Sequence, residues 1–228
     1  MSRVLPILFN TDMVRAILDG RKTVTRRVIK HPPHPDMPDS HNYCRMPLWM
    51  RIGKNECGFR TLHYMDVVEQ SPFKPTRYFE SLAPFDKGDI LYVRETWAEW
   101  TGGYLYKAWQ EPLVQPGKSA VMRWHPSIHM PKEAARIWLK VMDVRAEQLQ
   151  EITNEQILKE GIKKEAVEHY MAQFPETTEQ WVHAAHFLPF SDLWNSTIRK
   201  SEFDLYSWDS NPWVWAIEFE RCEKPEEN

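Results

Sequence analysis

The chain has 228 residues and a formal net charge of −3, with 29 Lys and Arg residues against 32 Asp and Glu residues. Hydrophobic residues make up 42% of it and aromatic residues 13%, which is enough to bury a substantial core and excludes a disordered protein. The near-neutral charge argues against strong non-specific binding to nucleic acid, because that affinity grows with the number of phosphates neutralised.

The charges are unevenly distributed along the chain. Residues 1–60 hold 11 Lys and Arg against 5 Asp and Glu, whereas residues 147–228 hold 7 against 17. We therefore expect any phosphate group to bind at the basic end.

The sequence predicts a cytoplasmic protein with free thiols. Its apolar stretch VLPILF is too short for a secretory signal, and no later run approaches the roughly 18 apolar residues of a membrane span, so no membrane partner is expected. The number of cysteines is three, which makes a disulfide framework unexpected.

The first expected element is a short helix over residues 11–19. Apolar residues recur there at helical spacing, Thr11 can cap the start, and Gly20 can adopt the left-handed conformation that ends a helix.

A strand is expected next, from the β-branched and roughly alternating stretch KTVTRRVI. Alternation places Lys22 and Arg26 on one face and Thr25 and Arg27 on the other, unless a twist or bulge near Lys22 brings Lys22 and Thr25 into one cleft. Five cations gather here: Arg21, Lys22, Arg26, Arg27 and Lys30. They can activate a nucleophile or base by lowering the pKa of an amine, bind phosphate, or simply form a solvated strand edge.

Residues 31–84 are interpreted as a proline-rich insertion with little regular structure. It contains His41, Cys44, Cys57 and His63, whose spacing could hold a tetrahedral zinc ion. Because only two cysteines take part and their order is unusual, we expect free cysteines and surface histidines instead, with no metal and no cofactor.

The remaining elements follow in a clear order. A turn at residues 87–89 leads into the β-prone DILYVRETWAEW, and YLYKAW is expected to be its hairpin partner. ARIWLKVMDVRAEQL predicts another strand, and ITNEQILKEGI predicts a helix capped by Thr153 and stopped by Gly161. Residues 163–196 are expected to be largely helical, and PWVWAIEFERC to form the last strand. This order predicts an α+β domain around a small, mainly antiparallel barrel or sheet.

Two further groups of polar and aromatic residues could serve a binding site. Arg94 and Glu95 interrupt an apolar strand, either as a structural ion pair or as part of a cleft. Most of the 11 tryptophans must be buried, but one or two beside a basic cleft could stack a base. Candidate binding residues in this group and in the loop RWHPSIHMP are Trp97, Arg123, Trp124 and His125.

Taken together, DGRKTVTRRV, KGDILYVRETW, ITNEQILKEGI and WVWAIEFE resemble the ASCH family of the PUA-like superfamily. The family pattern of glycine, one residue, lysine and an arginine five residues later matches Gly20, Lys22 and Arg27. The VRETW and PSIHMP segments look like the larger phage- and prophage-associated ASCH proteins. The resemblance implies one domain over residues 1–228: a small PUA-like β-barrel with flanking helices, an insertion at about 31–84 and a helical insertion at about 163–210 before the last strand.

The resemblance also implies a chemistry. Small bacterial members include amidohydrolases that remove the acetyl group from N4-acetylcytidine with a lysine, a threonine and a glutamate. By motif position the lysine matches Lys22 and the threonine matches Thr25, and Glu160 is the best match for the glutamate.

We therefore expect a protein that recognises RNA or a modified nucleoside in a basic cleft and hydrolyses N4-acylated cytidine. One alternative is a non-catalytic RNA- or DNA-binding module in which Arg26, Arg27, Arg94 and Arg123 contact phosphates. Another is a ribonuclease with His125 or His129 as acid and base. The sequence does not predict the oligomeric state.

Overall fold

The computed structural model describes residues 2–30, 49–54, 60–66, 77–109, 123–172 and 179–226. Its largest element is a five-stranded sheet with the spatial order β1-β6-β9-β10-β2. The strands are β1 (Val4–Leu8), β2 (Val24–Val28), β6 (Ile90–Arg94), β9 (Trp138–Gln148) and β10 (Trp213–Cys222). Only β1 and β6 pair in parallel within this sheet; the other neighbours are antiparallel. The fold is therefore mixed α+β with a mostly antiparallel sheet.

The sheet does not close into the small barrel that the family resemblance implied. Strands β1 and β2 are its two edges, and no backbone pairing joins them among the described strands. Pro6 in β1 has no N–H to donate to a further strand, which suits an edge position. The link between the two edges is instead a side chain, since Arg27 in β2 donates a hydrogen bond to the Leu8 carbonyl in β1 at 2.7 Å.

Helix α1 (Thr11–Leu18) joins β1 to β2 and confirms the first predicted element. Its N-cap is Asn10, not Thr11 as expected, because the Asn10 side chain accepts a hydrogen bond from the Met13 N–H at 2.8 Å. Gly20 has a φ of +74° and follows the helix end as predicted.

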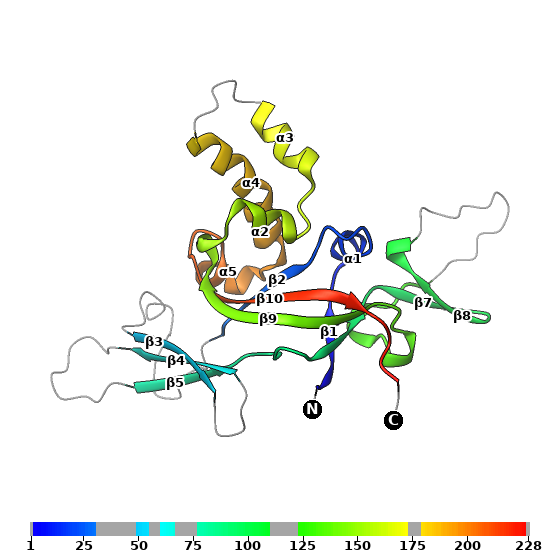
Figure 1. Cartoon of the computed structure of the whole chain (residues 1–228). Helices are drawn as coiled ribbons and strands as arrows, with labels where there is room; N and C mark the ends of the chain where they lie inside the picture. Colours follow the sequence, from blue (N-terminus) through cyan, green and yellow to red (C-terminus); the bar gives the residue numbers. More distant parts are fainter. Residues whose placement is uncertain are drawn as a thin grey trace.

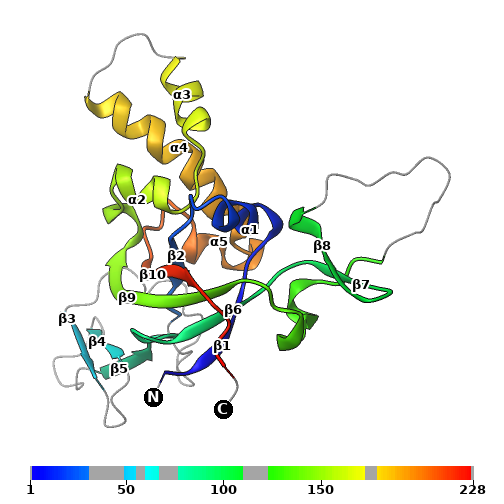
Figure 2. The same cartoon turned by 45° about the vertical axis from the view of Figure 1, so that its right-hand side comes forward.

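The stretch expected to be one long strand is divided at Glu95 and Thr96. β6 ends before them in the large sheet, whereas β7 (Trp97–Trp100) and β8 (Gly103–Tyr106) form a separate two-stranded ribbon. The predicted hairpin is thus confirmed, and the ribbon projects from the body of the protein beside α1 (Figure 2).

Part of the insertion is more regular than the sequence led us to expect. β3 (Trp49–Lys54), β4 (Arg60–Asp66) and β5 (Arg77–Leu82) form an antiparallel three-stranded sheet at the opposite end from the β7–β8 ribbon (Figure 1). The prolines that argued against structure lie outside these three strands, so they did not prevent pairing. Of the proposed zinc ligands, His41, Cys44, Cys57 and the His63 side chain lie outside the described residues.

The helices between β9 and β10 all lie on one side of these two strands (Figures 1 and 2). They are α2 (Asn154–Lys159), α3 (Lys164–Ala172), α4 (Glu179–Thr197) and α5 (Phe203–Tyr206). Thr153 caps α2 through a hydrogen bond from the Gln156 N–H, as predicted. Short 3-10 turns occur at η2 (Lys107–Trp109), η3 (Ser127–His129), η4 (Lys132–Ala134), η5 (Leu149–Glu151) and η6 (Lys200–Glu202). No helix in the described part of the chain is long and apolar enough to cross a membrane.

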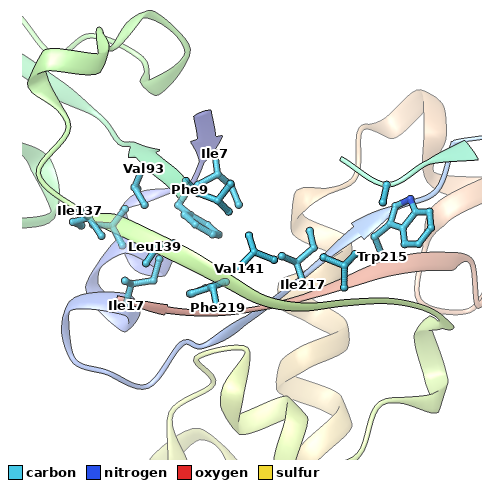
Figure 3. Close-up of a cluster of buried hydrophobic side chains, with 14 of the residues drawn as sticks. Ile7, Phe9, Ile17, Val93, Ile137, Leu139, Val141, Trp215, Ile217 and Phe219 are labelled. Atoms are coloured by element: carbon cyan, nitrogen blue, oxygen red, sulfur yellow. The ribbon is translucent and has the colours of Figure 1, made fainter. Parts of the chain in front are cut away.

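Two hydrophobic cores lie on opposite faces of the sheet. Side chains from β1, α1, β6, β9 and β10 meet in one row, with Ile137 at one end and Trp215 at the other (Figure 3). The second core packs α2, α3 and α4 against Val214, the neighbour of Trp215 in β10. Neighbouring residues of a strand point to opposite faces of the sheet, which is why Trp215 and Val214 belong to different cores.

Candidate functional site

The site forms where the ends of α1 and α2 meet at the start of β2. Lys22 lies in an isolated backbone bridge with Glu160, the C-cap of α2, and the Lys22 N–H donates to the Ala16 carbonyl at 3.0 Å. Gly161 follows with a φ of +97°, and a Cβ there would lie 2.8 Å from the Ala16 Cβ and 3.2 Å from the Lys22 Cβ. Glycine is therefore required for this close approach, a role beyond the helix stop that the sequence predicted.

The Lys22 side chain is fully buried, with an exposed fraction of 0%. Its ammonium Nζ donates to the Val24 carbonyl at 2.8 Å, the Glu160 carbonyl at 2.8 Å and Glu160 Oε2 at 2.6 Å. An ammonium has three protons, so each has an acceptor. Burial lowers the pKa of Lys22, the Glu160 carboxylate opposes that change, and the positive charges of Arg27 and Arg26 lower the pKa further.

The second oxygen of Glu160 accepts a hydrogen bond from Arg26 Nη1 at 2.9 Å. Arg26 also donates from Nε to Glu147 at 2.8 Å and from Nη2 to Gln156 at 3.1 Å, and only 1% of its side chain is exposed. We name Lys22, Arg26, Glu147 and Glu160 the Lys22 cluster. We expected Arg26 to contact nucleic acid, but its buried guanidinium instead holds the Glu160 carboxylate in place.

Thr25 is buried, with 3% of its surface exposed, and is paired in register with Ile217 of β10. Within the described residues its hydroxyl makes no hydrogen bond to Lys22 or Glu160. The structure thus brings two of the three expected catalytic side chains into contact and leaves the third unbonded to them.

Arg27 differs from the other four cations of the basic stretch. Arg21 pairs with Asp19, Lys22 and Arg26 pair with Glu160, and Lys30 pairs with Glu202. Arg27 has no carboxylate partner among the described residues. Its guanidinium lies 5.5 Å from the centre of the Phe9 ring, and burial lowers its pKa while Glu160 acts in the opposite direction.

A pocket of about 410 Å³ opens beside Arg27, between the edges of β1 and β2. We name it the β1–β2 pocket; its lining consists of residues 6–8 and 27–30 together with Pro84, Phe85 and Trp215. It combines two cations, Arg27 and Lys30, with aromatic and aliphatic walls. Lys22, Thr25 and Glu160 do not line it, so the expected catalytic residues lie outside the open pocket.

No local pattern in the sequence indicates this pocket. Pro84 ends the stretch interpreted as an insertion, Phe85 follows it, and Trp215 was one of many tryptophans expected to be buried. Residues 6–8 and 27–30 lie in or next to strands at opposite edges of the sheet, so their meeting at one pocket is a tertiary feature.

The other expected binding residues lie around the β7–β8 ribbon. Arg94 donates to the Met130 carbonyl at 2.7 Å, whereas the Glu95 carboxylate accepts two hydrogen bonds from Arg136, at 2.9 and 3.1 Å. The ion pair between Arg94 and Glu95, one of the two alternatives considered, is therefore not formed, and the partner of Glu95 is a residue that the sequence did not single out.

Two of the remaining candidates, Trp97 and His125, have their rings in contact. The Trp97 ring is buried and lies 5.1 Å from the His125 ring and 5.6 Å from the Tyr104 ring, measured between ring centres. Trp124 is half-buried and Arg123 is exposed. No hydrogen bond or ion pair joins this group to the Lys22 cluster within the described residues, and His129 is an exposed residue of η3.

No group of three or more His, Cys, Asp or Glu residues in the described part of the chain could hold a metal ion. Cys222 is a free, half-buried cysteine whose pKa is raised by burial. Comparison of the chain with protein-family models, curated proteins and solved structures gave no match in any of the three.

Proposed function

We propose that the protein recognises RNA or a modified nucleoside and hydrolyses the amide of N4-acylated cytidine, with an ASCH-like fold as the scaffold. The observation that carries the proposal is the buried contact between Lys22 Nζ and Glu160 Oε2 at 2.6 Å. A lysine and a glutamate in direct contact, away from water, can supply both a base and an acid to one reaction.

The ion pair can produce both groups by moving one proton. In the resting pair Lys22 carries three protons on nitrogen and Glu160 carries none. Transfer of one proton across the 2.6 Å contact leaves a neutral amine and a neutral carboxylic acid. Burial favours this neutral form because it lowers the pKa of Lys22.

The hydrolysis starts from this neutral pair. The Lys22 amine takes a proton from water, or from the Thr25 hydroxyl, as the oxygen attacks the acyl carbon. Glu160 donates its proton to the departing cytidine nitrogen as the C–N bond breaks. If Thr25 is the attacking group, a water molecule afterwards hydrolyses its ester. The products are a carboxylic acid and cytidine, and Lys22 and Glu160 return to their ion pair.

The β1–β2 pocket suits the polar part of such a substrate. Arg27 offers an unpaired guanidinium to a phosphate, and Phe85 and Trp215 supply apolar walls beside it. Lys22, Thr25 and Glu160 do not line the pocket, so hydrolysis requires a rearrangement that brings the acyl group to the Lys22 cluster.

The test is release of cytidine from N4-acetylcytidine by the wild type and by Lys22→Ala and Thr25→Ala. We expect both variants to lose activity by about 100-fold or more, as the removal of an acid–base group does. Lys159→Ala is the matched control, because Lys159 precedes Glu160 but is exposed and pairs with Glu155. Folded wild-type protein that releases no cytidine would contradict hydrolysis of this substrate.

A non-catalytic binding function is the second candidate. It is favoured by two observations: every ammonium proton of Lys22 already has an acceptor, and the open pocket is lined by Arg27 instead of the Lys22 cluster. A phosphate-binding module would lose RNA or DNA affinity steeply with salt, whereas nucleoside turnover would respond little. Measuring both at two salt concentrations separates the two functions.

A further inference from the structure

A second aromatic site lies on η2, away from the Lys22 cluster. Trp109 is the most exposed large hydrophobic side chain of the described residues, with 77% of its surface open to solvent. One side of its ring is occupied, because the Arg136 guanidinium lies 5.2 Å from the ring centre. The same guanidinium lies 4.3 Å from the centre of the Tyr106 ring.

Arg136 is itself held firmly. Its two hydrogen bonds to Glu95 fix the plane of the guanidinium, and 1% of the Glu95 side chain is exposed. A guanidinium fixed in this way holds the neighbouring Trp109 ring at low entropic cost. The indole is therefore a supported platform with one side packed and much of its surface open.

The platform has basic neighbours from α1 and from η2 itself. Arg15 of α1 donates from Nε to the Ala108 carbonyl at 3.2 Å, which brings a cation from the first helix to the residue before Trp109. Lys107 is exposed two residues before Trp109. In the described part of the chain, the buried Glu95 carboxylate pairs with Arg136, and the Asp12 carboxylate lies 3.4 Å from Arg15.

We propose that Trp109 stacks an unpaired base of single-stranded nucleic acid, with Arg15 and Lys107 contacting the flanking phosphates. An exposed aromatic ring beside cations is the combination with which single-strand binders hold their ligand. Among the described residues, Arg15, Lys107 and Arg136 carry three positive charges against the two carboxylates that pair with Arg15 and Arg136, so this surface complements a polyanion. This site does not depend on the proposed hydrolysis at the Lys22 cluster.

The test uses the full-length protein and fluorescein-labelled oligouridine and oligothymidine of about 12 nucleotides, a length within the range that one such module covers. Fluorescence anisotropy gives the dissociation constant. We expect Trp109→Ala to weaken binding by about fivefold or more and Trp109→Phe to retain most of it. Trp100→Ala is the matched control, because Trp100 is also an exposed tryptophan of this region but is not in contact with Arg136 among the described residues.

The two cations give an independent readout. Arg15→Ala and Lys107→Ala should each reduce the slope of log affinity against log salt concentration by about 1, the change expected for one lost phosphate contact. Cytidine release by Trp109→Ala should equal that of the wild type, which keeps this test separate from the test of hydrolysis.

The inference is overturned if the wild type binds neither oligonucleotide, or if Trp109→Ala binds as tightly as the wild type. Equal losses in Trp109→Ala and Trp100→Ala would also overturn it. A dimer in sedimentation that disappears in Trp109→Ala, without oligonucleotide binding, would assign the platform to a protein contact instead.

Discussion

Lys22 Nζ and Glu160 Oε2 lie 2.6 Å apart inside the protein, although the two residues are 138 positions apart in the sequence. The contact joins the end of α1 to the end of α2 and leaves 0% of the Lys22 side chain and 6% of the Glu160 side chain exposed. A buried pair of this kind is costly to break, because the remaining charge has no water to solvate it.

Glu160→Gln should therefore destabilise the fold strongly. The substitution keeps the shape of the side chain but removes the charge that neutralises Lys22 and Arg26, and we expect a loss of about 3–5 kcal/mol in the free energy of unfolding. Urea denaturation measures it. The double variant Lys22→Met/Glu160→Gln should lose less stability than the sum of the losses in the two single variants, since the Lys22 charge that Glu160 neutralised is then absent.

The matched control for this change is Glu155→Gln in the same helix. Glu155 forms an exposed pair with Lys159 at the i,i+4 spacing, so its removal should leave the denaturation midpoint almost unchanged. If Glu160→Gln were as stable as the wild type, the Lys22–Glu160 contact would not hold the two helix ends together.

The pH dependence of stability should carry the signature of Lys22. Its pKa is lowered in the folded state from an ordinary value of 10.5, so between the two values the unfolded chain binds more protons than the folded one. Stability contributed by this group therefore rises with pH across that window. Because Lys22→Met removes the group, the stability of the wild type relative to Lys22→Met should increase as pH rises toward 10.5. Denaturation at several alkaline pH values measures this difference in stability. A difference that stays constant with pH would contradict the lowered pKa.

Local signals in the sequence were sufficient for most of the fold. The left-handed glycine after α1 and the Thr153 cap of α2 were predicted because they act on residues within one turn of them. The three strands of the insertion were missed because prolines near them were weighed more heavily than their own alternating side chains. The division of β6 from β7 was missed because both halves have the same high strand propensity.

The site was harder to predict because its contacts are distant in the sequence. The roles expected for Lys22 and Glu160 came from a family resemblance, and their mutual contact could not be read from either local pattern. The buried position of Arg26 and the pairing of Glu95 with Arg136 depend on which strands become neighbours. Alternation along β2 indicated the two faces, but it could not show that Arg27 would be the cation of this stretch without a carboxylate partner among the described residues.

Gly161→Ala should be destabilising for two reasons that act together. The φ of +97° is unfavourable for any residue with a Cβ, and the added carbon would lie 2.8 Å from the Ala16 Cβ. Gly20→Ala provides the control, because Gly20 also has a positive φ but a Cβ there meets nothing within 4 Å. We expect Gly20→Ala to cost about 1–2 kcal/mol from backbone strain and Gly161→Ala clearly more. Equal losses of thermal or urea stability would show that the close approach of α1 and α2 has no energetic consequence.

Arg27→Ala should weaken the binding of a phosphate-bearing ligand in the β1–β2 pocket. Arg27 is the cation of the basic stretch without a carboxylate partner among the described residues, so an incoming phosphate does not have to displace an existing ion pair. Isothermal titration with cytidine monophosphate should show a loss of about tenfold or more, the effect of removing one charged hydrogen-bond partner. Arg221→Ala removes the same charge from an exposed position outside the pocket and should leave the affinity unchanged. If Arg27→Ala binds cytidine monophosphate as tightly as the wild type, the phosphate binds elsewhere. If Arg27→Ala and Arg221→Ala lose the same affinity, the loss comes from the change in net charge and not from a contact with Arg27.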